Sequence, residues 1–544
     1  MNFWDWSVIV FYIVVIIGIA LLLTPSQRNL QDYYLASKKI KWWQSGLSTM
    51  ATQLGAISFV SAPAFVALKE EGGLKWLCYE FSVPLGLILV MGIIIPTLHQ
   101  GRFISIYEYL ETRFDSSTRS LVSLLFQIGR GLATAVAVLA GGLILSTALA
   151  ISTTSAIILV GLVTIIYDVL GGIRVVILSD VLQMMIIMVG IILCGGIALN
   201  LAGWGESWSL ISPERLKILD FQHWGFSPEG KYGFWPMVIG GIFLYASYYG
   251  CDQSQVQREL TVKDVEAVRK SLLINALGRF PVVLMYCLMG IFIGAVVISP
   301  ESLSKMSSVM NLDQEAITQM LKNDPDRMVP LFILSFLPHG LIGFILVAIM
   351  SALMSSLDSA LNSLSAVTIR DFYQKYFRLD GDDRHYLIAS KVCTLFWGIF
   401  CVSVAIIFAN FGGAARQTTI VLINAVGSLL YGPILAAFVL GMITKMITSK
   451  AIKIGIILGV MANAYLWLFT PISWLWWNFF GFLVVVLVSS IFSGPKVFEK
   501  KASRLKEVFY HTKEGEGLNW KLIYIILIFY FFMIIFLCYL IEKS

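Results

Sequence analysis

The sequence predicts an all-α membrane protein with about fourteen transmembrane helices. Of the 544 residues, 58% are hydrophobic and only 13% are charged, whereas soluble domains carry about 25% charged residues. Apolar runs of about 20 residues, the length that crosses the hydrocarbon core, recur from Trp6 to Leu540. The charged residues gather in the segments between these runs, so the chain is suited to a bilayer.

A scan for apolar runs of spanning length gives fourteen candidates. They cover residues 6–24, 44–68, 73–100, 118–149, 153–170, 176–202, 234–256, 270–298, 328–370, 386–410, 416–445, 451–470, 472–493 and 521–541. The first run has no basic segment before it, so we expect 6–24 to be a retained helix and not a cleaved signal peptide.

The basic residues predict the orientation, because cytoplasmic loops collect Lys and Arg. The first residues carry only an acidic side chain, Asp5, which suits an outer N-terminus. The loops that then fall inside contain Arg28, Lys38, Lys39, Lys41, Arg258, Lys263, Arg269, Lys270, Lys445, Lys450, Lys453, Lys496, Lys500, Lys501, Arg504, Lys506 and Lys513. We therefore expect a multi-pass protein of the plasma (inner) membrane with its N- and C-termini on the outer side.

Several functions are disfavoured by what the sequence lacks. The seven cysteines form no CxxC and the five histidines no HxxxH, so no zinc or redox site of these types is indicated. There is no GxxxxGK[ST], no GxGxxG opening a helix after a strand, and no nucleophile–base constellation, which argues against ATP-driven transport and against an enzyme. The net charge of +6 indicates membrane orientation, not a nucleic-acid partner.

Two spanning segments contain residues that weaken a helix. Segment 44–68 contains Gly46, Gly55 and Pro63, and segment 234–256 contains Gly240, Gly241 and Gly250. A matched pair of broken helices is typical of inverted-repeat transporters, in which unwound backbone lines the binding cavity. The alternative is that these glycines only let helices pack closely.

Six stretches resemble the sodium:solute symporter family, which includes bacterial sodium/galactose and sialic acid symporters. They occur in the family's order: YYLASKKIKWW at 33–43, ISIYEYLETRF at 104–114, DVLGGIRVVILSDVLQM at 168–184, YGCDQSQVQREL at 249–260, SSLDSALNSLSAVTIRDFY at 355–373 and YGPILAAFVLGM at 431–442.

The resemblance implies one polytopic domain over 1–544 with the LeuT-like fold. A leading helix at 6–24 precedes two inverted five-helix repeats at 44–202 and 234–445, and three helices follow at 451–541. We expect the protein to function as a monomer.

A serine stripe on the ninth predicted helix suggests a cation site. Ala352, Ser355, Ser356 and Ser359 share one helical face because they lie 3, 4 and 7 positions apart. The resemblance implies Na⁺ bound by the carbonyl oxygens of Ala51, Leu54 and Ala352 and the hydroxyls of Ser355 and Ser356. Such oxygen ligands suit a hard cation.

Two acids in membrane segments suggest a second Na⁺ site. Asp180 and Asp358 lie near the stripe, and an ionisable side chain placed there costs at least about 2.5–3.5 kcal/mol. Asp358 departs from the family, where a small hydroxyl residue is usual. Together with Ser359 these acids form a possible second site; alternatively, Asp358 pairs with an arginine and binds no ion.

The resemblance implies a solute site formed by seven residues: Gln53, Ser58, Glu80, Arg130, Tyr248, Arg279 and Asn424. The position of Arg130 corresponds to a carboxylate-binding arginine in sialic acid symporters, and those of Glu80 and Arg279 to charged residues of a sugar site. The alternative is that these charges neutralise one another or the two aspartates.

The function expected from these features is Na⁺-coupled import of a small polar organic solute, a sugar or sugar acid such as a sialic-acid-like compound, by alternating access. The alternative is a carrier of a monocarboxylate, vitamin or amino acid. A sensory or channel-like protein of the same fold is less favoured.

Overall fold

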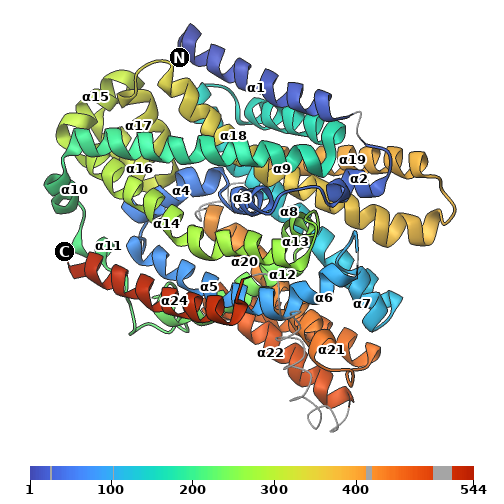
Figure 1. Cartoon of the computed structure of the whole chain (residues 1–544). Coiled ribbons are helices and arrows are strands. Elements are labelled where there is room, and N and C mark those ends of the chain that lie inside the picture. Colours follow the sequence, from blue (N-terminus) through green and yellow to red (C-terminus); the bar gives the residue numbers. More distant parts are fainter. Residues whose placement is uncertain (25–26, 102, 229, 412–418, 494–517, 544) are drawn as a thin grey trace.

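The computed structural model describes residues 1–24, 27–101, 103–228, 230–411, 419–493 and 518–543. Every regular element in these ranges is a helix, which confirms the all-α prediction. Figure 1 shows the long helices packed side by side, with α1 (Phe3–Leu23) along the top of the view and α24 (Trp520–Lys543) at the lower left.

The other long helices are α8 (Ser116–Leu149), α9 (Thr153–Ala202), α14 (Val265–Ile298), α18 (Leu341–Val367), α19 (Asp383–Phe411), α20 (Thr419–Ile443), α21 (Ser449–Phe469) and α22 (Trp474–Ser493). The shorter α-helices are α2 (Leu30–Leu35), α3 (Trp42–Gln53), α4 (Ala56–Ala67), α5 (Ser82–Leu89), α6 (Ile95–Gln100), α7 (Glu108–Arg113), α10 (Trp204–Leu210), α11 (Pro213–Leu216), α12 (Gly241–Cys251), α13 (Gln253–Glu259), α15 (Pro300–Met310), α16 (Gln314–Asn323) and α17 (Met328–Phe336). Turns of 3₁₀- or π-helix are η2 (Ala36–Lys38), η3 (Leu74–Phe81), η4 (Val90–Ile94), η5 (Pro236–Gly240), η6 (Pro325–Arg327) and η7 (Thr368–Phe377).

Eleven helices of the described ranges are long and apolar enough to span a bilayer, or twelve when α3 and α4 count as one bent span. α9 alone has 50 residues and leaves the helical conformation at Gly172. A straight helix of that length would extend about 75 Å, more than twice the bilayer core of about 30 Å, so it has the length of the two spans expected at 153–202. The expected span 234–256 is divided among η5, α12 and α13, and the count of fourteen stays a prediction.

The span expected at 328–370 is wrong at its start. α17 ends at Phe336 and α18 begins at Leu341. The chain between them contains Gly340, whose backbone adopts φ +86°, a conformation that glycine reaches far more readily than other residues.

Both segments predicted to be broken are broken. α3 and α4 meet at Leu54 and Gly55 with a bend of 53°. A Cβ on Gly55 would lie 2.9 Å from Ser356 Oγ, so the absence of a side chain lets the break approach α18. In the other segment the helix stops at Asp252, where the backbone is extended (φ −93°, ψ 118°).

The prediction that Gly240, Gly241 and Gly250 interrupt their helix is therefore wrong, because all three keep a helical conformation. They serve close packing instead. A Cβ on Gly240 would lie 2.3 Å from the carbonyl oxygen of Leu475, and one on Gly241 would lie 2.3 Å from Ser82 Oγ.

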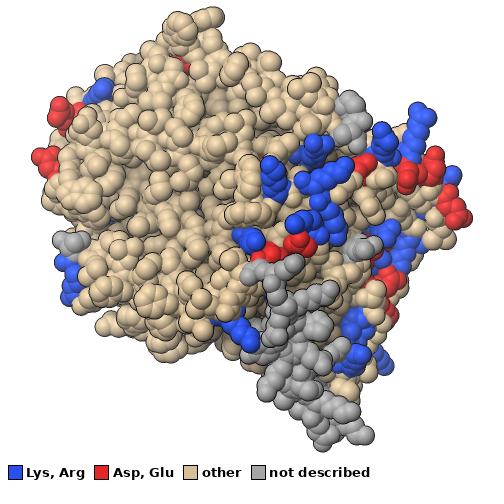
Figure 2. All heavy atoms as spheres, viewed as in Figure 1, with Lys and Arg blue, Asp and Glu red and all other residues tan. Residues whose placement is uncertain are grey.

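Figure 2 shows Lys and Arg gathered at one end of the bundle, around α2, α7 and α19, which we call the basic end. The chain ends marked in Figure 1 lie toward the opposite end. Arg258 and Arg269 do not belong to the basic end as exposed loop charges, because only 0% and 3% of their surfaces are exposed. Both were assigned to an inside loop from the sequence, and that assignment is wrong.

The stretches 33–43 and 168–184 meet at the kink of α9. Gly172 has φ +57° and ψ −164°, a conformation open in practice only to glycine. A Cβ there would lie 2.7 Å from Tyr33 Cδ2 and from the Tyr33 carbonyl oxygen. The kink thus depends on glycine for both its backbone and its contact with α2.

Replacing Gly172 by alanine should destabilise the fold, because strain at such a backbone position costs about 1–3 kcal/mol. We expect Gly172→Ala to lower the midpoint of thermal unfolding in detergent. Gly196→Ala in the same helix, where a Cβ meets nothing within 4 Å, should leave the midpoint unchanged or raise it. Equal midpoints for the two variants would contradict this account.

Candidate functional site

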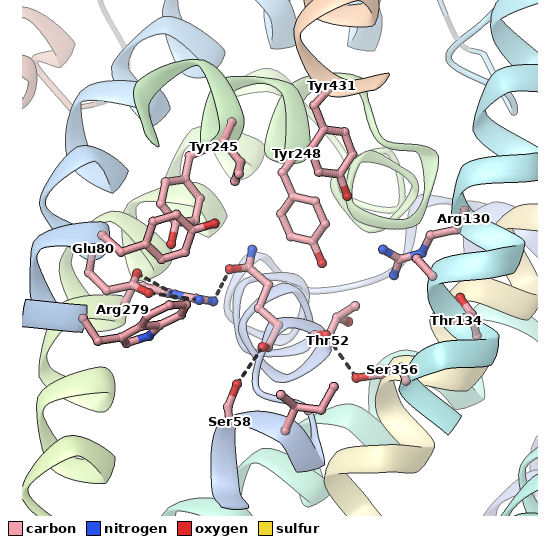
Figure 3. A pocket seen from close by; sticks show the side chains of 18 of the residues that line it. Thr52, Ser58, Glu80, Arg130, Thr134, Tyr245, Tyr248, Arg279, Ser356 and Tyr431 are labelled. Carbon is pink, nitrogen blue, oxygen red and sulfur yellow. Dashed lines mark hydrogen bonds and ion pairs between the residues drawn. The ribbon is translucent and has the colours of Figure 1, made fainter. Parts of the chain in front are cut away.

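An internal cavity of about 160 Å³ lies at the break between α3 and α4. One group of lining residues is aromatic: Trp76, Tyr79, Tyr245, Tyr248, Tyr286 and Tyr431. Figure 3 shows two charged groups on opposite sides of this cavity, Glu80 with Arg279 on one side and Arg130 on the other.

Arg279 of α14 is already neutralised. Its Nε lies 2.8 Å from Glu80 Oε2 and its Nη2 lies 3.2 Å from Glu80 Oε1, while Nη1 donates to Gln53 Oε1. Glu80 is 1% exposed and Arg279 7%. Such a two-bond pair is geometrically fixed, so it shapes the cavity wall and contributes little net charge.

Arg130 of α8 is held more loosely. Its Nη1 lies 3.7 Å from Asp252 Oδ2, beyond hydrogen-bond distance. Asp252 Oδ1 accepts from the backbone N and the Oγ of Ser254 and so caps α13. Arg130 Nε is buried and finds no hydrogen-bond partner in the described part of the chain. The guanidinium therefore has donor capacity left for a solute.

The start of α4 adds to the positive character of the cavity. Gly55, Ile57 and Ser58 line the cavity at this helix start. The first turn of a helix carries unpaired N–H groups and a partial positive charge. Broken helices in transporters use this end to hold anionic groups of the substrate.

The residues of the predicted Na⁺ site converge where α3 ends against α18. Ser355 Oγ lies 3.2 Å from the Ala51 carbonyl oxygen and 3.3 Å from that of Ala352, and Ser356 Oγ lies 3.2 Å from the Ala352 carbonyl oxygen. Leu54, at the break, is 1% exposed.

This oxygen cluster fits a cation. Oxygens that bind a cation at about 2.3–2.6 Å, the Ca²⁺ range, lie roughly 3 Å or slightly more from their neighbours in its shell. The oxygen–oxygen distances of 3.2–3.3 Å in this cluster are close to that separation. The last carbonyls of a helix carry a partial negative charge. Here they belong to α3, where the Ala51 carbonyl oxygen also accepts from Leu54 N at 3.1 Å. The five residues named from the sequence are thus adjacent in space.

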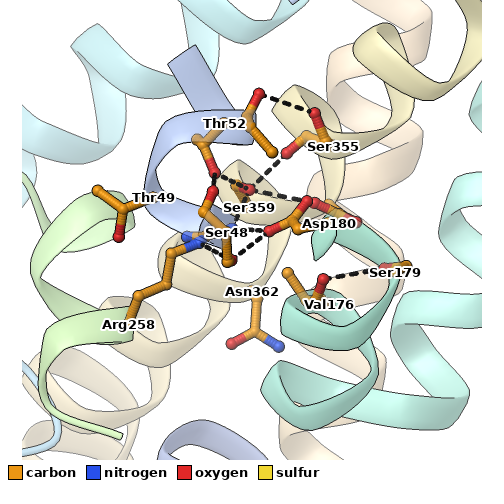
Figure 4. A network of polar contacts seen from close by, with 12 residues as sticks. Ser48, Thr49, Thr52, Val176, Ser179, Asp180, Arg258, Ser355, Ser359 and Asn362 are labelled. Atoms are coloured by element: carbon orange, nitrogen blue, oxygen red, sulfur yellow. Dashed lines mark hydrogen bonds and ion pairs between the residues drawn. The ribbon is translucent and has the colours of Figure 1, made fainter. Parts of the chain in front are cut away.

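A second polar network lies next to this cluster (Figure 4). Asp180 Oδ2 of α9 accepts from Ser48 Oγ at 2.5 Å and lies 3.0 Å from Nη2 of Arg258 on α13. The same Nη2 donates to Ser359 Oγ. Two of the three residues of the possible second site are therefore in contact with one guanidinium.

Asp358 does not form the alternative salt bridge among the described residues. Its Oδ2 accepts from Tyr167 OH at 2.5 Å and its Oδ1 from Ser359 Oγ at 3.1 Å. It is 0% exposed. A buried carboxylate needs a compensating charge or a proton, and two hydroxyl donors supply neither.

At the end of the bundle opposite the basic end, the loop segment η6 packs on α4. Ser61 Oγ donates to Asp326 Oδ2 at 2.9 Å. Burial raises the pKa of Asp326 to about 6. This contact joins α4, the second half of the broken helix, to the long segment between α14 and α17.

The structure places six of the seven predicted solute-site residues on the cavity: Gln53, Ser58, Glu80, Arg130, Tyr248 and Arg279. The seventh, Asn424, belongs to α20, but its side chain lies outside the described residues. The roles of these residues stay predictions.

The sequence analysis missed Asp252 and Ser48 as parts of the site, and it took Arg258 for a loop charge. One signal could have found Arg258. Two acids in membrane segments require a cation, and Arg258 lies in the stretch 249–260 that carries the resemblance.

The chain was compared with known proteins. The sequence model of the sodium:solute symporter family matches residues 33–459. The human (Homo sapiens) sodium/iodide cotransporter is 27% identical over 85% of this chain and 69% of its own length. Sodium-coupled monocarboxylate transporter 1 of Xenopus laevis is 27% identical over 84% and 71%, and the sodium/glucose cotransporter of Vibrio parahaemolyticus is 26% identical over 87% and 86%.

A solved structure shares the fold. It is a substrate-bound, outward-open Na⁺-coupled sialic acid symporter, similar with a TM-score of 0.79 at 24% identity over 90% of this chain and 98% of that one.

A helix bundle whose cavity lies at a broken helix, beside a cluster of carbonyl and hydroxyl oxygens, is typical of secondary transporters. The chain belongs to the sodium:solute symporter family. It is a multi-pass Na⁺-coupled solute symporter and not an enzyme, with Na⁺ as its coupling ion.

Removing one member of the Glu80–Arg279 pair should destabilise the protein, because breaking a buried pair costs about 3–5 kcal/mol. We expect Glu80→Gln and Arg279→Gln each to lower the thermal unfolding midpoint in detergent. The double variant Glu80→Gln/Arg279→Gln should lose less than the two losses added together. Strict additivity would show that the pair is not coupled.

Proposed function

We propose that this symporter imports a small solute that carries a carboxylate, a sugar acid or a short monocarboxylate, together with Na⁺. One observation supports direct coupling. Ser356 lines the cavity and also lies in the oxygen cluster, and Thr52 lines the cavity while its carbonyl oxygen accepts from Ser356 Oγ at 3.3 Å. Solute and cation would therefore share a wall.

The proposed cation site consists of the carbonyl oxygens of Ala51, Leu54 and Ala352 and the hydroxyls of Ser355 and Ser356. Na⁺ there would hold the end of α3 against α18. Because cation and solute stabilise the same arrangement, each should raise the affinity for the other by the same factor.

The solute class follows from charge. Arg279 is paired with Glu80 through two bonds. Arg130, in contrast, lies 3.7 Å from Asp252, and its Nε finds no partner among the described residues. Arg130 and the start of α4 are therefore the groups most available to an anion. A carboxylate is common to sugar acids and monocarboxylates, and monocarboxylate transporters are among the relatives.

We assign the basic end to the cytoplasm, because cytoplasmic loops are enriched in Lys and Arg. Both termini then lie outside. Each net positive charge that enters down a potential of 100 mV contributes about 2.3 kcal/mol, or roughly fiftyfold in solute accumulation. A singly charged carboxylate cancels the charge of one Na⁺, so the potential drives its uptake only when more than one Na⁺ accompanies it. We propose that the monomer is sufficient for transport, since cavity and cation cluster are formed within one chain.

The cation site is tested by Ser355→Ala/Ser356→Ala, which removes two of five oxygens. The Na⁺ concentration for half-maximal uptake in proteoliposomes should rise at least about tenfold, equivalent to about 1.4 kcal/mol. Ser363→Ala is the matched control, because Ser363 Oγ donates only to the nearby Ala360 carbonyl oxygen, at 2.9 Å. An unchanged Na⁺ dependence in the double variant would refute the site.

The solute class is tested by Arg130→Gln. Loss of one partner of a buried charged pair costs about 2–5 kcal/mol, so acidic solutes should no longer stabilise the variant in a thermal-shift screen. Stabilisation by Na⁺ should persist. Arg130→Lys, which keeps the charge, should retain part of the response. If a neutral sugar is the solute that stabilises the wild type, or if acids stabilise Arg130→Gln normally, then Arg130 is structural.

A further inference from the structure

Arg258 joins four elements at the inner end of the cation cluster (Figure 4). It belongs to α13, which follows the break at Asp252. Its Nε donates to Ser48 Oγ of α3 at 2.7 Å, and its Nη2 contacts Asp180 of α9 and Ser359 of α18. Its side chain is 1% exposed. The halves of both broken helices that face the basic end are thus fastened to α9 and α18 through one guanidinium.

The atoms that Arg258 uses are atoms that a second Na⁺ would need. Asp180 and Ser359 belong to the possible second site, and both contact the same Nη2. Asp180 Oδ1 is buried with no hydrogen-bond partner in the described part of the chain. A guanidinium and a bare cation cannot both take Ser359 and the same face of the carboxylate.

The local charge favours a cation beside Asp180 throughout the cycle. Asp180 and Asp358 are both 0% exposed, and burying two uncompensated carboxylates close together is strongly unfavourable. A proton on one of the two acids leaves the other to be compensated. A carrier that has released Na⁺ must still close its inner end before it can turn outward again, and a second cation within reach of Asp180 would make that closure favourable.

We propose that Arg258 is a tethered cation that competes with a second Na⁺ for Asp180 and Ser359 and takes its place during the return of the empty carrier. This inference rests on the proposed Na⁺ symport and on the possible second Na⁺ site that the sequence indicates at Asp180, Asp358 and Ser359. When Na⁺ binds, the guanidinium gives up Asp180; when Na⁺ leaves, the guanidinium returns and the inner halves α3 and α13 close on α9 and α18.

Arg258→Gln separates the two halves of the transport cycle. Net uptake requires return of the empty carrier, whereas counterflow with Na⁺ and solute on both sides requires only the loaded carrier. Net uptake should fall at least tenfold more than counterflow. Binding of Na⁺ to the second site can be measured without solute, by thermal shift of purified protein that carries Ser355→Ala/Ser356→Ala. Adding Arg258→Gln to this double variant should lower the Na⁺ concentration for half-saturation at least several-fold.

Two further variants give the result its specificity. Arg258→Lys keeps a charge and should recover part of the net uptake. Arg269→Gln is the matched control: Arg269 is equally buried, but its Nε donates to the Met91 carbonyl oxygen of η4 at 3.1 Å, so it should leave the ratio of net uptake to counterflow unchanged. Thermal unfolding of each variant shows whether it is folded.

Equal losses of net uptake and counterflow in Arg258→Gln, or an unchanged Na⁺ affinity, would overturn the tethered-cation role. If Arg258→Gln does not fold, Arg258→Lys decides: its ratio of net uptake to counterflow should be lower than that of the wild type, and a ratio equal to the wild-type value would overturn the tethered-cation role. The proposed function fails separately, if the wild type shows no Na⁺-dependent uptake of any acidic solute.

Discussion

The break between α3 and α4 is the constraint on which the other sites depend. At Leu54 and Gly55 the carbonyl end of one helix and the amide end of another face the same space. The first attracts a cation and the second an anion. Since Gly55 has no side chain, α18 can bring Ser356 against this point. Adjacent sites for opposite charges are therefore a consequence of backbone geometry.

The bilayer explains why the remaining charges lie where they do. A buried charge without a partner is too costly to keep, so each arginine near the cavity contacts a carboxylate on another element. Arg279 contacts Glu80, Arg130 approaches Asp252, and Arg258 contacts Asp180. These pairs differ in strength. The close pair Arg279–Glu80 is suited to a fixed wall of the cavity. The loose pair Arg130–Asp252 is suited to the proposed exchange, in which Arg130 binds a solute carboxylate.

Much of this arrangement could be predicted from periodicity. Hydrophobic runs gave the spans, and the spacing of Ser355, Ser356 and Ser359 gave the helix face. The break at Asp252 could not be predicted, because it depends on an extended residue that caps the next helix and not on glycine. Arg258 was misassigned for a related reason: a charge next to a polar stretch looks like a loop charge until tertiary contacts bury it.

Coupling in this architecture follows from shared atoms. Thr52 and Ser356 border the cavity, and both take part in the oxygen cluster. Any movement of α3 away from α18 separates Ala51 from Ser355 and at the same time removes a wall of the cavity. Because one displacement opens both contacts, the proposed cation site cannot stay intact while this wall of the cavity moves away.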